Sequence, residues 1–140
     1  MFSRINLQTN SDITAASQIL SWFEQLNYPP LNDFKIWWQC QTLLQEGFTN
    51  TVEHAHKNLP RETPIALEAV RSCHFIEIRI WSHGTPFDLR QKLQETRGIE
   101  NIEDERGRGL KIMSMIADEM SYEQSEDGRY CLYMKKNYAA

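Results

Sequence analysis

The stretch from Asp33 to about Lys57 carries the pattern that most restricts how this chain can fold. Polar and apolar side chains recur there in two sets, each with members four residues apart. The polar set is Glu46, Asn50 and His54, and the apolar set is Leu44, Phe48 and Val52. Residues four apart share one stripe of an α-helix, and these two stripes lie roughly 200° apart round the axis. The pattern predicts a long helix with one face packed on a core.

The polar face of this helix is the first candidate site. A carboxylate, a carboxamide and an imidazole would line about 12 Å of it, from the rise per residue. An acid and an amide one turn apart can serve as a base and as a metal ligand. The alternative is the solvated side of an ordinary amphipathic helix, and the stripe taken alone favours that alternative.

Length, charge and cysteine content limit the class of protein. The 140 residues predict one domain, residues 1–140, that can bury a core. A net charge of −4 argues against nucleic-acid binding, and no apolar run is long enough to span a membrane. The first residues, Met1–Asn6, lack the apolar core of a signal peptide. No CxxC spacing occurs, so reduced core thiols in a cytoplasmic protein are expected at Cys40, Cys73 and Cys131.

The remaining segments predict helices early in the chain and strands later. Helices are expected from Ser11 or Asp12 to about Leu26, over Asp88–Glu95, and from Leu110 to Ile116. Strands are expected over Phe2–Gln8, Ile65–Arg71, Phe75–Trp81, Met120–Ser125 and Tyr130–Lys135. The fold class is therefore α+β: a two-layer sandwich in which helices cover one face of a mixed, mostly antiparallel sheet.

Two further segments contain residues that could take part in a binding site. Ser82-His83-Gly84 follows a central strand, and Gly107-Arg108-Gly109-Leu110 follows a polar loop over Thr96–Arg106. A glycine pair lets the backbone approach a ligand closely, and a helix N-terminus attracts anions. Three cationic residues add positive charge near the N-terminus of the helix predicted after the glycine pair, namely Arg106, Arg108 and Lys111. The alternative for this third segment is a simple turn from a loop into a helix.

In this order and spacing, the three segments resemble the nucleotide boxes of the GHKL (histidine-kinase-like) ATPase superfamily. They are most similar to its small single-domain branch, the anti-sigma-factor serine/threonine kinases of bacteria. The likeness covers about Asn6 to Lys135 and includes the run Gly84-Thr85-Pro86-Phe87-Asp88 in the second box. The resemblance implies that the segment Thr96–Arg106 forms a lid over the nucleotide.

The resemblance also implies roles for individual residues, with ATP and Mg²⁺ as cofactors. Asn50 would bind Mg²⁺, and Glu46 would act as general base on a serine hydroxyl of a protein substrate. Gly107 and Gly109 would let the backbone wrap the phosphates, while Arg108 offsets their charge. The further nucleotide-binding residues implied are Ser82, Gly84, Arg106 and Leu110. No role is implied for His54, and the other histidines have no metal-ligand spacing.

One position departs from the family pattern. The second box normally reads Asp-x-Gly, with the aspartate accepting the adenine amino group, and here Ser82 takes its place. Losing a bond to a charged group costs roughly 1.5–3 kcal/mol, about ten- to a hundredfold in affinity.

Three functions therefore stay open. The first is an ATP-dependent protein serine kinase that regulates transcription by partner switching, with a sigma factor or its antagonist as partner. The second is a degenerate binding module without nucleotide turnover, and the third is an α+β domain unrelated to nucleotides. The resemblance implies a homodimer through the first strand, since an edge strand needs cover. Candidate exposed aromatic residues for a partner surface are Trp22, Phe23, Trp37 and Trp38, although one of the adjacent tryptophans can instead cover the sheet.

Overall fold

The computed structural model describes residues 2–84 and 105–138, and for residues 105–108 it describes the backbone alone. The elements in chain order are β1 (Phe2–Asn10), η1 (Ile13–Ala15), α1 (Ala16–Glu24), α2 (Phe34–Asn50), η2 (Thr51–Ala55), β2 (Pro64–Ser72), β3 (Phe75–Ser82), α4 (Glu105–Ile116), β4 (Glu119–Gln124) and β5 (Tyr130–Asn137). The element η1 is a 3-10 helix and η2 is a π-helix. The helix predicted over Asp88–Glu95 lies outside the described residues.

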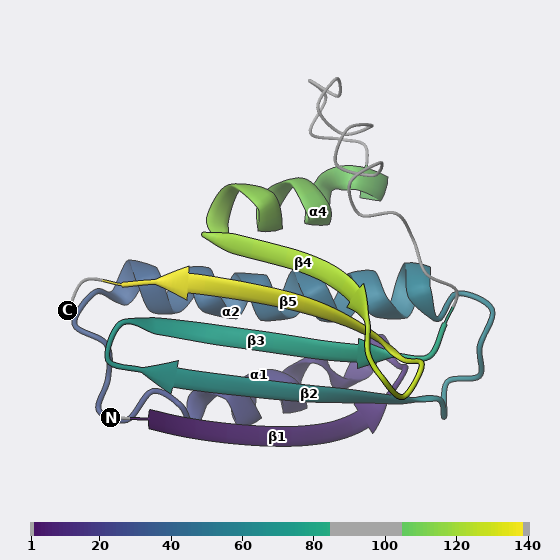
Figure 1. Cartoon of the computed structure of the whole chain (residues 1–140), viewed down its shortest axis with the longest axis horizontal. Coiled ribbons are helices and arrows are strands. Elements are labelled where there is room, and N and C mark those ends of the chain that lie inside the picture. Colours follow the sequence, from purple (N-terminus) through teal and green to yellow (C-terminus); the bar gives the residue numbers. More distant parts are fainter. Residues whose placement is uncertain (1, 85–104, 139–140) are drawn as a thin grey trace.

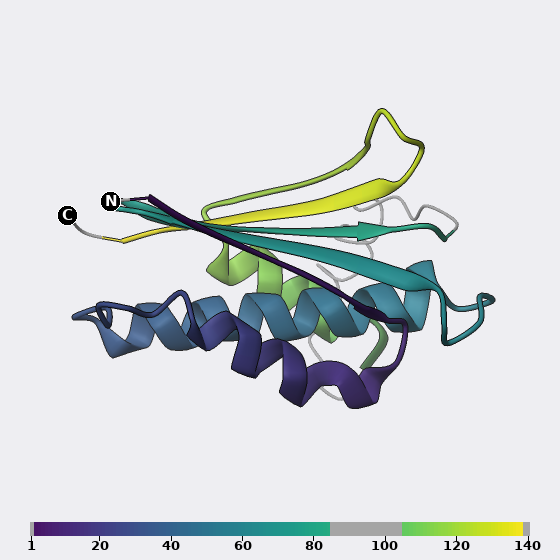
Figure 2. The same ribbon diagram turned by 90° about the horizontal axis from the view of Figure 1, so that it is seen from below.

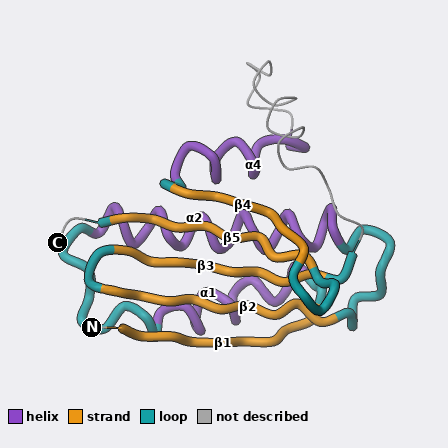
Figure 3. The backbone as a smooth tube through the Cα atoms, viewed as in Figure 1, coloured by secondary structure: helices purple, strands orange, loops and turns teal. Residues whose placement is uncertain are grey.

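The sheet has five strands in the order β1-β2-β3-β5-β4 (Figures 1 and 3). Helices α1, α2 and α4 all lie on one of its faces (Figure 2). The predicted two-layer α+β class is thereby confirmed. Every pairing among the described strands is antiparallel, so the sheet contains no parallel component in that part of the chain. The β2–β3 and β4–β5 hairpins account for two of these four pairings, because a strand that returns through a short turn must run antiparallel.

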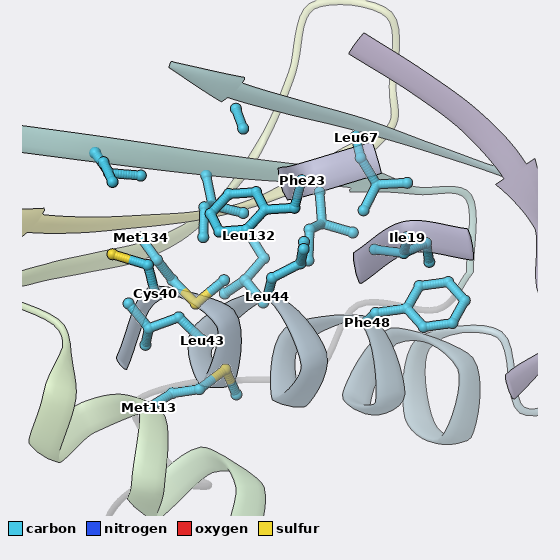
Figure 4. Close-up of a cluster of buried hydrophobic side chains, with 14 of the residues drawn as sticks. Ile19, Phe23, Cys40, Leu43, Leu44, Phe48, Leu67, Met113, Leu132 and Met134 are labelled. Carbon is cyan, nitrogen blue, oxygen red and sulfur yellow. The ribbon is translucent and has the colours of Figure 1, made fainter. Parts of the chain in front are cut away.

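The core fills the space between the sheet and the helices. On β3, Ile76, Ile78 and Ile80 are each 1% exposed, as their alternation predicted. Leucine and phenylalanine side chains of α1 and α2 meet Leu132 and Met134 of β5 in the same cluster (Figure 4). This packing fixes α2 across the sheet and so sets the position of its polar residues.

Aspartate caps begin both early helical segments where the sequence predicts them. The Asp12 carboxylate accepts a hydrogen bond from the Thr14 backbone N–H at 3.0 Å, at the start of η1. Asp33 caps α2 in the same way, accepting from the Lys35 N–H at 3.0 Å. Such caps satisfy amide donors that the first turn leaves without partners.

The aromatic residues of α1 are buried, which contradicts their predicted exposure. Phe23 is fully buried and its ring stacks on that of Trp37 in α2 with centroids 4.7 Å apart, and Trp22 is 8% exposed. The Trp22 indole N–H donates to the backbone oxygen of Asn6 at 3.0 Å, so its polar atom is satisfied. Of the adjacent pair, Trp37 is buried and Trp38 is 56% exposed, since neighbouring residues of a helix point in different directions.

The three cysteines are free thiols, with different degrees of burial. Cys40 is buried and Cys131 is half-buried, consistent with core thiols. The prediction is wrong for Cys73, which is exposed because it lies in the short turn between β2 and β3. None of the described helices combines the length and the apolar composition needed to cross a bilayer.

Candidate functional site

The predicted stripe on α2 exists up to Asn50. Leu44 and Phe48 are buried in the core, and Val52 packs against it. Glu46 is half-buried, while Asn50 is only 6% exposed. The polar stripe is therefore a largely enclosed surface and not a solvated helix face.

The helix changes its hydrogen-bonding pattern directly after Asn50. The Thr51 hydroxyl donates to the Gly47 carbonyl oxygen at 2.9 Å, and the His56 N–H donates to the Thr51 carbonyl oxygen at 2.9 Å. The second bond spans five residues, so the turn η2 is wider than an α-helical turn. A hydroxyl bonded to the carbonyl four residues earlier favours such a distortion.

This wide turn exchanges one histidine for another. His54 is exposed and does not continue the stripe as predicted, because the extra residue in the turn rotates it away. His56 is buried instead, at 2% exposure. Sequence reasoning gave no role to His56, since its burial depends on the π-turn, which apolar spacing does not predict.

His56 joins the helix end to the end of β3. Its Nε2 atom accepts a hydrogen bond from the His83 backbone N–H at 2.9 Å. Burial lowers the pKa of His56, and the neighbouring His83 lowers it further. The neutral ring is therefore favoured, which suits an acceptor at Nε2.

Gly84, in the second motif, lies directly against the end of η2. A Cβ atom at this position would lie 1.4 Å from the carbonyl oxygen of Ala55, so no larger residue fits without backbone movement. Ser82, two residues earlier, is 2% exposed at the end of β3, opposite Tyr130 of β5. The rest of this motif, Thr85–Asp88, lies outside the described residues.

The third motif meets the first through Gly109. A Cβ atom at Gly109 would lie 2.7 Å from the Oε2 atom of Glu46, so the α4 backbone lies beside this carboxylate. Leu110 is buried in the core. The structure thus places Gly109 of the third motif beside Glu46 of the first, and Gly84 of the second motif beside Ala55, five residues after Asn50.

The glycine pair lies inside α4, and this corrects the sequence-based boundary. The helix begins at Glu105, whereas the sequence predicted its start at about Leu110 with the glycines before it. The polar residues Glu105 and Arg106 extend α4, which apolar spacing alone could not indicate. The backbone of Arg106, Gly107 and Arg108 is helical, and the side chains of these residues lie outside the described part of the structure. Of the lid predicted over Thr96–Arg106, residues 96–104 lie outside the described part of the structure as well, and Glu105 and Arg106 belong to α4 instead.

Aromatic residues that the sequence reasoning did not place at the site lie beside it. The rings of Tyr130 and Tyr122 stack with centroids 5.6 Å apart and planes 13° apart. Tyr130 lies two residues before the buried Leu132 and Tyr122 pairs directly with Leu132, so both rings lie on the helix side of the sheet. Tyr130 pairs with Ser82 in the sheet. The spacing of two residues between Tyr130 and the apolar Leu132 was the signal in the sequence that both side chains share one face of the strand.

The donor set fits a nucleotide with a magnesium ion. The amide nitrogen of Asn50 is buried without a hydrogen-bond partner among the described residues, so a polar ligand would satisfy it. The carbonyl and carboxylate oxygens of Asn50 and Glu46 are hard donors of the kind Mg²⁺ prefers. No group of three or more histidine, cysteine or acidic side chains gathers in the described ranges. Phosphate and water oxygens would therefore have to complete the coordination, which is common for Mg²⁺.

Comparisons with known proteins agree with this geometry. A sequence model of the family described as "Histidine kinase-like ATPase domain" matches residues 9–136. Among solved structures, the chain is similar to a chain of the SiaB–SiaC complex from Pseudomonas aeruginosa. The TM-score is 0.64 at 13% sequence identity, covering 96% of this chain and 89% of the other. At this identity the likeness concerns the fold. No curated protein sequence matches the chain.

Proposed function

Because the chain belongs to the histidine kinase-like ATPase domain family, we propose that it binds ATP with Mg²⁺ and phosphorylates a serine of a partner protein. In this proposal it is an anti-sigma-factor-like kinase of the bacterial cytoplasm that regulates transcription by partner switching. One observation carries the proposal: Glu46 of the first motif lies against Gly109 of the third. A carboxylate that lies beside the backbone of a second motif is placed where a general base could act between the two motifs.

Four of the described site residues have a task in the proposed reaction. A bound Mg-ATP supplies the γ-phosphoryl group, with the metal offsetting its charge. Glu46 takes the proton from the serine hydroxyl as the oxygen–phosphorus bond forms, and ADP is the leaving group. The carbonyl oxygen of Asn50 would hold the metal. Gly109 leaves room for the Glu46 carboxylate, and Gly84 keeps the end of β3 against η2.

The proposed partners are proteins, namely a sigma factor or its antagonist. The similar fold found in the SiaB–SiaC complex supports a protein partner, since that structure is a complex of two different proteins. We also propose a homodimer through β1. This strand of 9 residues pairs with β2 alone among the described strands, so its other edge offers unpaired backbone groups.

Substitution of the proposed base tests the kinase function. We expect Glu46→Gln to lower phosphoryl transfer from ATP to a serine-containing antagonist protein by roughly 100- to 10,000-fold, the range for a general base. Nucleotide binding should stay nearly unchanged, because the amide keeps the size and hydrogen-bonding capacity of the side chain. The matched control is Glu53→Gln, an exposed position about two turns further on. Equal transfer by Glu46→Gln and the control would contradict the assignment.

A second function is favoured by one residue, the buried Ser82. It stands where the family places an aspartate that accepts the adenine amino group, and it is shorter and uncharged. Under this alternative the chain keeps the fold and its partner surface without nucleotide turnover.

The two functions differ in what Ser82→Asp does. The binding-module alternative predicts that this substitution creates or strengthens binding of adenine nucleotides, by about ten- to a hundredfold. Calorimetry with Mg-ADP measures this directly, beside Ser114→Asp, which adds the same charge at an exposed position. Weaker binding by Ser82→Asp would mean that the wild-type pocket recognises adenine by another route, and would exclude the alternative.

A further inference from the structure

A cavity lies at the opposite end of α2 from the candidate site. The start of α2 lies at the end of the sheet where both chain termini are found, and η2 lies at the other end (Figure 1). The cavity has a volume of about 790 Å³, within the usual range for small-molecule sites. It is formed by the segment between α1 and α2, the first turn of α2, and the ends of β2 and β5. Its lining residues are Pro29, Pro30, Leu31, Asn32, Asp33, Ile36, Arg71, Asn137 and Tyr138.

The buried cation of this cavity is Arg71, at 3% exposure. Its Nη1 atom donates to the backbone oxygens of Leu26 at 3.0 Å and of Pro29 at 2.6 Å. Its Nε atom is buried without a hydrogen-bond partner in the described part of the chain. No aspartate or glutamate among the described residues forms an ion pair with it. The guanidinium therefore has an unpartnered donor at Nε and a charge without an ion-pair partner among the described residues.

The two backbone contacts compensate this charge only in part. Leu26 follows the end of α1, where the helix dipole places about half a negative charge. Holding the segment between α1 and α2 explains these contacts, but it uses a single nitrogen of the side chain. A buried charge without an ionic partner is costly, and an anionic ligand would remove that cost.

We propose that this cavity binds a small organic carboxylate with an apolar body. The planar guanidinium of Arg71 matches a carboxylate through two parallel hydrogen bonds, for which the unpaired Nε atom is one donor. The apolar body would lie against Pro29, Leu31 and Ile36, with the ring of Tyr138 as a further wall. Tyr138 is held in place because its backbone N–H donates to the His74 oxygen at 2.9 Å.

The lining argues against a phosphate dianion. Arg71 is the single lysine or arginine among the lining residues, and Asp33 is a carboxylate among them. A dianion would meet repulsion from Asp33 and only one cation, whereas a monocarboxylate needs just one bidentate partner.

A pair of probes that differ only in charge tests the proposal on the unaltered protein. Phenylpropionate and phenylpropionamide share the same apolar body, and inorganic phosphate serves as a third probe. We expect phenylpropionate to bind about ten- to a hundredfold more tightly than the amide, and to shift the NMR signal of the Arg71 Nε–H. Equal binding of the two, stronger binding of phosphate, or no saturable binding at millimolar concentration would overturn the proposal.

Two variants locate the binding. Arg71→Met removes the charge at similar length, and Ile36→Trp fills the cavity while Arg71 remains, which guards against a folding defect in the first variant. Both should abolish binding of phenylpropionate. The control is Arg61→Met, an arginine whose side chain is 78% exposed and which is not among the lining residues. Binding that survives both cavity variants would place the ligand elsewhere and contradict the proposal.

Discussion

His56 is the residue on which the join between η2 and β3 depends. Its ring is buried, and its Nε2 atom accepts the His83 backbone N–H. Protonation at Nε2 would replace that acceptor by a donor and so break the contact. The residue therefore connects the proton concentration to the geometry around Gly84, two elements away in the sequence.

The lowered pKa of His56 gives stability a defined pH dependence. The unfolded chain takes up the proton near pH 6.5, whereas the folded chain takes it up only at lower pH. The stability that His56 contributes is therefore complete above about pH 6.5 and is lost as the pH falls from there through the lower pKa of the folded state. Urea unfolding between pH 8 and 5 should show this slope in the wild-type protein and a smaller slope in His56→Gln.

A second histidine provides the control for that measurement. His74 is exposed and lies in the turn between β2 and β3, away from the join. His74→Gln should keep the wild-type slope. If His56→Gln and His74→Gln showed the same pH dependence, the loss of stability at low pH would have another origin.

At the scale of elements, the contact between α2 and α4 positions the proposed base. A methyl group at Gly109 would lie 2.7 Å from the end of the Glu46 side chain, which can move aside because it is flexible. We therefore expect Gly109→Ala to fold, with the helix more stable by roughly 0.5–1 kcal/mol from propensity. Phosphoryl transfer should fall because the carboxylate is displaced, whereas nucleotide binding should persist.

Thermal unfolding and phosphoryl transfer, measured on the same preparation, check this expectation. Ser114→Ala is a control in the same helix, since Ser114 is exposed and its hydroxyl donates only within α4, to the Lys111 carbonyl oxygen at 2.8 Å. Full transfer activity in Gly109→Ala would mean that the position of Glu46 is not set by α4.

The sequence allowed the elements to be predicted where local physics decides them. Alternation identified β3, aspartate caps identified the starts of η1 and α2, and the turn residues identified the β4–β5 hairpin. The burial of Trp22 could not be foreseen in this way, because it depends on a hydrogen bond to β1. The π-turn after Asn50 has a local hydroxyl contact, from Thr51 to Gly47, but the packing of Gly84 against its end is a tertiary feature that the sequence does not indicate.

The sequence predicted the site as a set of separate motifs. The structure adds the contacts between those motifs that it describes. The meeting of Glu46 with Gly109 joins segments more than two elements apart, which spacing alone does not determine. The cavity around Arg71 had no signal in the sequence. A single arginine in a strand is expected to point into solvent. That Arg71 is buried follows only from its contacts with the segment between α1 and α2.

At the scale of the whole molecule, α2 connects two distinct sites. Its 17 residues span roughly 25 Å, with the Arg71 cavity at its start and Asn50 as its last residue. Both ends rest on the same antiparallel sheet, and the core between them is continuous. The candidate nucleotide site and the proposed carboxylate site can therefore be tested independently, by variants that do not share contacts.

The central claim is that the described motifs form a working nucleotide site. Its most direct test is calorimetric titration of the protein with Mg-ATP, beside Asn50→Ala, which removes the proposed metal ligand. Asn58→Ala is the control, because Asn58 is an exposed asparagine outside the site. We predict saturable binding at micromolar nucleotide that weakens at least tenfold in Asn50→Ala and stays unchanged in the control. Absence of binding at millimolar Mg-ATP, or equal binding by Asn50→Ala, would contradict the claim.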